Sequence, residues 1–290
     1  MITLQLLLNA LALGMAYALV ALGFVLALNA AGAVNFAHGD LVVLGGAAAV
    51  FIGLLTGLPS VLLLPLVALA IGVAGIVVAR IAILPLASRP PEATFVATIA
   101  LAAIIEQGLT VMLGGAPRAA PAIAGVGSVE VAGVALGRQP LAIVLVGGAL
   151  VAALWFLLER TQLGRRMRAV AADRHMARAV GIPVGAYVTL SLALAGALAG
   201  IAGFLLGHQF LVSPTQGAGH MLKAYIAVAL GGWGSVPGAL LGALAIGVFE
   251  TLVSAGFGDA WASAALYIAV LAILAVRPQG LFGEPAGRRA

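Results

Sequence analysis

The stretch NFAHGD, residues 35–40, lies between two long apolar segments and holds an amide, an imidazole, a glycine and a carboxylate within six residues. Such a cluster predicts a break between helices, because glycine permits a turn and short polar side chains accept hydrogen bonds from the first amides of a helix. We expect Gly39 to supply the turn and Asp40 to cap the following helix. Asn35 and His38 are equally compatible with a capping role and with the polar lining of a transport pathway, and Gly39 is also a candidate pathway residue.

The chain around this stretch is too apolar for a water-soluble domain. Of its 290 residues, 63% are hydrophobic and 8% are charged, whereas about a quarter of the residues in soluble domains are charged. We therefore expect an integral membrane protein, in contact with the lipid bilayer. The first apolar segment exceeds a signal-peptide core and lacks a basic flank, so we expect it to be retained. The sequence has no cysteine and only scattered histidines, so we expect no metal site.

Nine apolar segments are candidates for membrane spans, which need about 20 residues each. The one after NFAHGD and the seventh are short, and the seventh runs into a second predicted break, GGWGSVPG, residues 231–238. The predicted fold is all-α, a polytopic membrane helix bundle of about eight or nine spans with broken or re-entrant helices, forming one domain over residues 1–290. The segments are 4–28, 41–55, 61–84, 94–113, 141–158, 187–206, 222–230, 238–255 and 262–276.

The second break has the same two interpretations as the first. Its glycines and proline free backbone groups that are tolerated in a membrane only inside protein or beside a wet cavity. It could line a pathway, or it could be a tight turn between two short helices. The candidate pathway residues in it are Gly231, Gly232, Gly234 and Ser235.

The basic residues predict the orientation of the chain. Six of the 14 fall within residues 160–178, and three more, Arg277, Arg288 and Arg289, lie in the tail at 277–290. Clusters of this kind beside apolar spans are typical of cytoplasmic loops, so the net charge of +5 does not indicate nucleic acid binding. Counting spans backwards places residues 89–92 inside and 114–139 outside. The N-terminus is then outside if segment 41–55 crosses fully, and inside if it does not.

The cytoplasmic loop at 159–185 is the only long charged element. Met167, Val170, Ala171 and Met176 recur at helical spacing, which predicts one short amphipathic helix ended by Gly181 and Pro183. Such a helix could lie on anionic lipid, or it could dock into a groove of a soluble partner.

Four motifs in order resemble the branched-chain amino acid ABC transporter permeases, and specifically the subunit that carries NFAHG. They are NFAHGD, LGRRMRAVAADRHMARAVGI (163–182), LGGWGSVPGALLG (230–242) and RPQGLFG (277–283). The resemblance implies a second permease subunit, two cytoplasmic ATPase subunits and a periplasmic or extracellular solute-binding protein, in a bacterial inner membrane. It also implies that the loop couples to the ATPase through Leu163, Gly164, Arg165, Arg166, Arg168, Ala169, Asp173, Ala177, Gly181 and Ile182.

No cofactor is expected on this chain, because it has no phosphate-binding loop of the GxxxxGK[ST] type. Magnesium and ATP would be bound by the partner ATPase, and the chain itself would not be an enzyme. The expected function is passage of branched-chain or other small neutral amino acids by alternating access. Two alternatives remain: a related permease for urea or short amides, and an ion-coupled secondary transporter.

Two glutamates lie well inside apolar segments, where an ionisable group costs a few kcal/mol. Glu106 and Glu250 could each be a structural carboxylate hydrogen-bonded to a neighbouring helix, and either would be the coupling site in an ion-coupled transporter. Glu250 matches a position where the family tends to have glutamate and is a candidate pathway residue, whereas Glu106 departs from the pattern. We expect Lys223, the only lysine, to snorkel to a membrane surface.

Overall fold

The computed structural model describes residues 2–114, 116–125, 127–131 and 134–277. Most of the tail predicted at 277–290, including Arg288, Arg289 and all but the first residue of RPQGLFG, lies outside the described residues. All nine expected segments form helices, and eight helices are long and apolar enough to cross a membrane. The exception is the seventh, α9, which has 15 residues.

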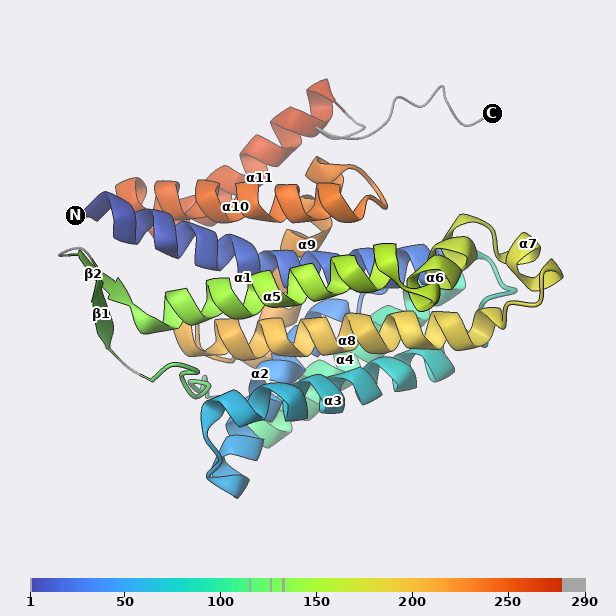
Figure 1. Cartoon of the computed structure of the whole chain (residues 1–290), viewed down its shortest axis with the longest axis horizontal. Helices are drawn as coiled ribbons and strands as arrows, with labels where there is room; N and C mark the ends of the chain where they lie inside the picture. Colours follow the sequence, from blue (N-terminus) through green and yellow to red (C-terminus); the bar gives the residue numbers. More distant parts are fainter. Residues whose placement is uncertain (1, 115, 126, 132–133, 278–290) are drawn as a thin grey trace.

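Helices make up nearly all of the secondary structure, as expected (Figure 1). They are α1 (Ile2–Ala31), α2 (His38–Thr56), α3 (Ser60–Val78) with the π-helical turn η1 (Ala79–Ile83), α4 (Pro91–Leu113), α5 (Arg138–Arg160), α6 (Gln162–Ala172), α7 (Arg174–Ala179), α8 (Val184–Gln209), the 3-10 turn η2 (Pro214–Gln216), α9 (Gly217–Gly231), α10 (Val236–Phe257) and α11 (Asp259–Val276). An antiparallel hairpin, β1 (Ser128–Val131) and β2 (Val134–Gly137), lies within the loop predicted outside the membrane.

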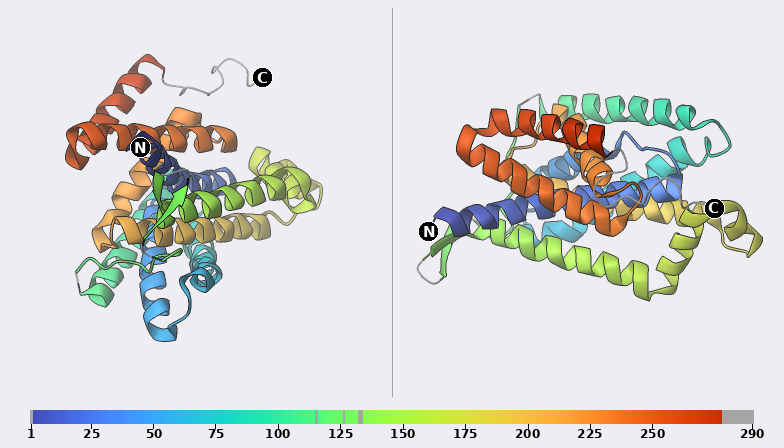
Figure 2. Two further views of the ribbon diagram at one scale, coloured as in Figure 1. Left: turned by 60° about the vertical axis from the view of Figure 1, so that its left-hand side comes forward. Right: turned by 90° about the horizontal axis from the view of Figure 1, so that it is seen from above.

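The core of the bundle consists of α1 and α8. The apolar stretch of α1 is 89% buried and that of α8 is 72% buried, whereas those of α4 and α11 are 17% buried. The outer helices α3, α4, α5 and α11 therefore present apolar side chains outward, as helices do in lipid. Figure 2 shows α4 and α11 at the periphery, with α1 running through the middle.

The first predicted break is present and lies deep in the bundle. Helix α1 ends at Ala31, and α2 begins only at His38, whose imidazole Nε2 lies 3.0 Å from the carbonyl oxygen of Val20. Because Val20 is well inside the 30-residue α1, the chain has turned back along α1 before α2 starts. Helix α9 also begins inside the bundle, since its first residue, Gly217, lies against Gly39. The amino-terminal ends of two short helices thus meet between the core helices.

Glycines allow the helices to approach closely, as their number predicts. A side chain on Gly45 would overlap Gly200, and one on Gly203 would overlap the carbonyl oxygen of Val42, so α2 crosses α8 nearly backbone to backbone. Gly75 and Gly196 allow the same close approach between α3 and α8. Gly148 has open space around it and is not a packing residue.

The packing pattern of α1–α3 recurs in α8–α10 with the opposite direction. In each set, a long helix is followed by one that starts at the junction, the place where the amino-terminal ends of α2 and α9 meet. The third helix of each set packs antiparallel on the first helix of the other set, α3 on α8 and α10 on α1. Helix α1 ends, and α8 begins, at the end of the bundle that bears α6 and α7 (Figure 1). Opposed repeats with broken second helices are typical of transporters that place their pathway at the repeat interface.

The two ends of the bundle follow the predicted topology. The N-terminus and the hairpin lie at one end, and α6 and α7 lie at the other (Figure 1). Of the two alternatives for the N-terminus, the structure supports the one in which the second segment completes a crossing, since α2 is long and apolar enough to span. Residues 32–37 return along α1 to the junction and α2 covers the remaining depth, so the two together complete one crossing.

Candidate functional site

At the junction between α2 and α9, helix α2 does not begin with the predicted side-chain cap. No side chain caps α2, whose N-cap residue is Ala37, so the prediction that Asp40 has this role is wrong. Asn35 instead accepts a hydrogen bond of 3.2 Å at Oδ1 from the amide of Ala37. Gly39 is inside the helix and is not the turn; it is needed because a Cβ there would overlap Gly217. The positive φ that reverses the chain, 62°, belongs to Gly32.

His38 is a core residue. Its side chain is fully buried between α1 and α8, and its ring lies 6.1 Å from that of Phe24. Its Nδ1 has no hydrogen-bond partner among the described residues. Neither His38 nor Asn35 is among the residues that line the cavity between α2, α4 and α9, and a pathway role for either stays a prediction.

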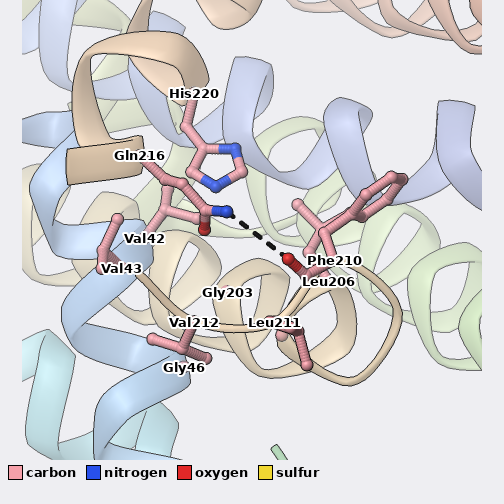
Figure 3. A pocket seen from close by; sticks show the side chains of 11 residues that line it. Val42, Val43, Gly46, Gly203, Leu206, Phe210, Leu211, Val212, Gln216 and His220 are labelled. Atoms are coloured by element: carbon pink, nitrogen blue, oxygen red, sulfur yellow. Dashed lines mark hydrogen bonds between the residues drawn. The ribbon is translucent and has the colours of Figure 1, made fainter. Parts of the chain in front are cut away.

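The chain around the start of α9 is tightly closed. Figure 3 shows a small pocket with His220 above it, Gln216 and Val42 of α2 at the left, and Leu206 of α8 at the right. The pocket offers about 10 Å³, which is room for about one water molecule. Gln216 Nε2 donates to the carbonyl oxygen of Phe210 over 3.4 Å, which helps hold the segment that re-enters the bundle. This pocket is too small for an amino acid.

A larger cavity opens on another side of the same junction. It has a volume of about 630 Å³ and lies between α2, α4 and α9. Most of its wall is apolar or aromatic, and two carboxylates, from Asp40 and Glu106, interrupt it. The other lining residues are Phe36, Ile99, Ala102, Ala103, Ala218, Met221, Leu222 and Tyr225. A mostly apolar cavity with a few convergent polar groups is the usual form of a small-molecule site.

The second break, GGWGSVPG, is a tight turn near the end that bears α6 and α7. Ser235 Oγ caps α10 by accepting the amide of Gly238 over 3.1 Å, and Asn29 Nδ2 donates to Gly234 O over 2.9 Å. Gly232 and Gly234 have positive φ angles of 97° and 80°, and Gly231 packs against Gly238. Of the four predicted pathway residues, Gly234 lines a cavity, one of about 280 Å³ that Asn29 also lines.

Glu250 lies in an ion pair. Its Oε1 is 2.6 Å from Lys223 Nζ, which also donates to the hydroxyl of Tyr17 over 2.7 Å. The pair joins α9 to α10 and α1 inside the bundle, so the expectation that Lys223 reaches a membrane surface is wrong. The prediction that Glu250 finds a partner on a neighbouring helix is confirmed.

The charged loop forms two helices where one was expected. Asp173 ends α6 and caps α7, accepting the amides of Met176 and His175 at Oδ1 over 3.0 and 2.7 Å. These hydrogen bonds lower the pKa of Asp173. Gly181 has a φ of 81°, and the amide of Ile182 donates to Ala177 O, which ends the helical region where predicted.

Three arginines of the loop attach it to the bundle. Arg174 donates to the carbonyl oxygen of Ala30 at the end of α1, and Arg166 Nη1 donates to the hydroxyl of Tyr187 in α8 over 3.2 Å. Arg168 donates to Leu158 O and lies 3.1 Å from Glu159, both in α5. The loop is thus tied to three membrane helices.

The remaining loop residues divide into a buried and an exposed set. Gly164, Ala177, Met167 and Val170 are buried, and Ala169 is partly buried. Arg165 is exposed, as are the apolar side chains of Leu163, Met176 and Val180. Ala171 and Met176 were expected on the apolar face with Met167 and Val170, but both are exposed. Met176 and Val180, which follows α7, are 66% and 74% exposed.

An apolar helix bundle with opposed repeats, broken helices and a cavity between its helices is the architecture of a multi-pass membrane transport protein. Over residues 6–275 the sequence matches the family described as branched-chain amino acid transport system, permease component. The chain belongs to this family of permeases.

Similar proteins carry related names. BraD of Pseudomonas aeruginosa, a high-affinity branched-chain amino acid transport system permease protein, is 31% identical over 97% of this chain and 96% of its own length. LivH of Escherichia coli K12, which has the same description, is 29% identical over 97% of this chain and 96% of its own length. The fructose import permease protein FrcC of Rhizobium meliloti is 36% identical over 46% of this chain and 39% of its own.

Proposed function

We propose that the chain is a permease subunit of an ATP-driven importer of branched-chain or other small neutral amino acids in the bacterial inner membrane. A second permease subunit, two cytoplasmic ATPase subunits that bind Mg-ATP, and a solute-binding protein outside would complete the transporter. The attachment of the α6–α7 loop to three membrane helices is the observation that carries this proposal.

A loop of this construction can transmit a movement. Its contacts reach α1 through Arg174, α5 through Arg168 and α8 through Arg166. A partner that displaces the loop therefore acts on both core helices at once, and such shifts of packed helices are a common form of switching. The exposed Met176 and Val180 give the loop an apolar tip, which suits a groove on a soluble protein better than water.

At Glu250, the structure gives the ion-coupled alternative little support. The carboxylate of Glu250 already has a cation, Lys223, at 2.6 Å, so this site has no need of a transported ion. A secondary carrier would also have no use for a loop tied to three helices.

Site-directed crosslinking tests the proposal. Because the chain has no cysteine, a photoactivatable crosslinker on Met176→Cys reports the neighbours of α7 alone. We expect one crosslinked protein, an ATPase, in membranes that contain the whole transporter. Leu145→Cys on α5, also an exposed apolar position at 72%, should give no such product. Crosslinks from Met176→Cys to lipid alone would contradict the proposal and favour an interfacial helix.

A further inference from the structure

The 630 Å³ cavity at the junction has an acidic lining. Asp40 and Glu106 both line it, and no lysine, arginine or histidine does. Within the described part of the chain, neither carboxylate forms an ion pair, since the ion pairs there are Arg168 with Glu159 and Lys223 with Glu250.

Of the two carboxylates, Asp40 provides the stronger evidence for a binding site. Its side chain is 5% exposed, and across the described ranges no side chain or backbone group of another residue hydrogen-bonds to its carboxylate. It does not cap α2, and it lies against Gly217, at the start of α9. An ionised carboxylate that is buried without a cation beside it costs several kcal/mol, and a cation from outside the chain would offset this cost.

Glu106 reaches the cavity from a different helix, the peripheral α4. An ionisable residue in a membrane helix almost always faces the bundle interior or a water-filled cavity, and here it faces the same cavity as Asp40. Glu250, by contrast, is a structural glutamate with a cationic partner, because Lys223 Nζ lies 2.6 Å from its Oε1. The absence of such a partner near Asp40 and Glu106 distinguishes the two sites.

The rest of the wall indicates what kind of cation would fit. Phe36 and Tyr225 are aromatic, and Ile99, Met221 and Leu222 are aliphatic. Aromatic faces attract organic cations, and aliphatic walls suit a hydrocarbon side chain. No group of three potential metal ligands occurs in the described residues, so the wall suits an organic ammonium better than a metal ion.

We propose that Asp40 and Glu106 bind the ammonium group of the transported solute, and that this pair makes the permease prefer amine-bearing solutes to uncharged ones. The inference rests on the proposed function and extends it. The binding protein selects the solute first, and the cavity then selects again for solutes that carry an ammonium group. Specificity of this kind matters in a family whose relatives include a protein named as a fructose import permease.

The charge of the cavity can be measured without any substrate. Ala103→Cys places the only thiol of the chain in the cavity wall, one helical turn before Glu106. In the assembled transporter, we expect cationic methanethiosulfonates to react faster than anionic ones of similar size, by on the order of tenfold. Adding Asp40→Asn and Glu106→Gln should abolish this preference. Glu92→Gln, an exposed glutamate at the start of the same helix, is the matched control and should leave it unchanged.

Three ligands then identify the group that binds. Leucine and 3-methylbutylamine, which both carry the ammonium, should slow labelling of Ala103→Cys, whereas 4-methylpentanoate, which lacks it, should not. Protection by both amines should disappear when Asp40→Asn and Glu106→Gln are present.

Any of three results would overturn the inference: equal rates for the two reagents, no labelling by either, or protection by 4-methylpentanoate but not by the amine. Protection by sodium or potassium ions instead of the amines would also overturn it, in favour of an inorganic cation. A failure of ATP-driven uptake would count against the proposed function and leave the labelling preference untouched, so the two failures are distinguishable.

Discussion

Lys223 Nζ lies 2.6 Å from Glu250 Oε1, and this pair ties the short helix α9 to α10 inside the bundle. The side chains are 18% and 8% exposed, so water screens the pair little. Removal of one partner from a buried ion pair leaves an uncompensated charge and costs about 3–5 kcal/mol, whereas replacement of both partners by apolar residues is often nearly neutral. The two residues should therefore be strongly coupled.

A double-mutant cycle tests this coupling. Glu250→Leu should lower the thermal stability of the purified protein strongly, and Glu250→Gln less, because glutamine still accepts a hydrogen bond from Lys223. Lys223→Met combined with Glu250→Leu should recover most of the loss. If the double variant is as unstable as the sum of the single ones, the pair is not the reason for the burial of Glu250.

The crossing of α2 and α8 should not tolerate a methyl group. Gly203→Ala would place a Cβ against the carbonyl oxygen of Val42, so we expect a destabilisation of about 1–3 kcal/mol and a lower melting temperature. Gly148→Ala is the matched control, since nothing lies within 4 Å of the added carbon. Alanine there should be neutral or slightly stabilising, because it favours helix by up to about 1 kcal/mol over glycine. Equal effects at the two positions would mean that the close crossing is absent.

Two neighbouring arginines of the loop should differ in their roles. Arg165 is exposed, so Arg165→Glu should weaken association with the ATPase and leave the melting temperature unchanged. Arg168→Glu should also lower the stability of the loop, by roughly 1 kcal/mol, because Arg168 contacts Glu159 and Leu158 O in α5. Both variants should insert normally into the membrane. Pull-down of the ATPase at normal yield by a variant with both reversals would contradict a docking role for the arginines.

The cap at Asp173 makes the second helix of the loop sensitive to acid. The hydrogen bonds from Met176 and His175 hold the pKa of Asp173 below its usual value. The stabilisation is therefore complete above the unfolded pKa and is lost as the pH falls through the lower, folded pKa. Hydrogen exchange in α7 should quicken in strong acid, and Asp173→Ala should produce the same quickening at neutral pH. Asp173→Asn should retain part of the protection, and an unchanged rate in Asp173→Ala would show that the cap is unimportant.

The spans were predictable from the sequence because long apolar segments between glycine-rich polar stretches indicate helices that cross lipid. The partners of the buried charges were not. Asp40 lines the same cavity as Glu106 although the whole of α3 separates them in sequence, and Lys223 meets Glu250 only because α9 folds back on α10. Hydropathy places a residue in a helix but does not say which neighbour its side chain faces.

One local signal was available and could have improved the prediction. Asp173 precedes a helical stretch and is a favoured N-cap residue, so the split of the loop into α6 and α7 could be read from its sequence. The depth of the first break was less accessible. It depends on residues 32–37 returning along α1, a tertiary arrangement that no local pattern near NFAHGD specifies.

Uptake by the reconstituted transporter tests the central claim most directly. The chain, assembled with its partner permease, ATPase subunits and binding protein in sealed vesicles, should accumulate leucine only when Mg-ATP is present on the ATPase side. Uptake should stop when the ATPase is inactivated, with or without a proton or sodium gradient. Accumulation that persists on an ion gradient without ATP would contradict the account and identify an ion-coupled carrier.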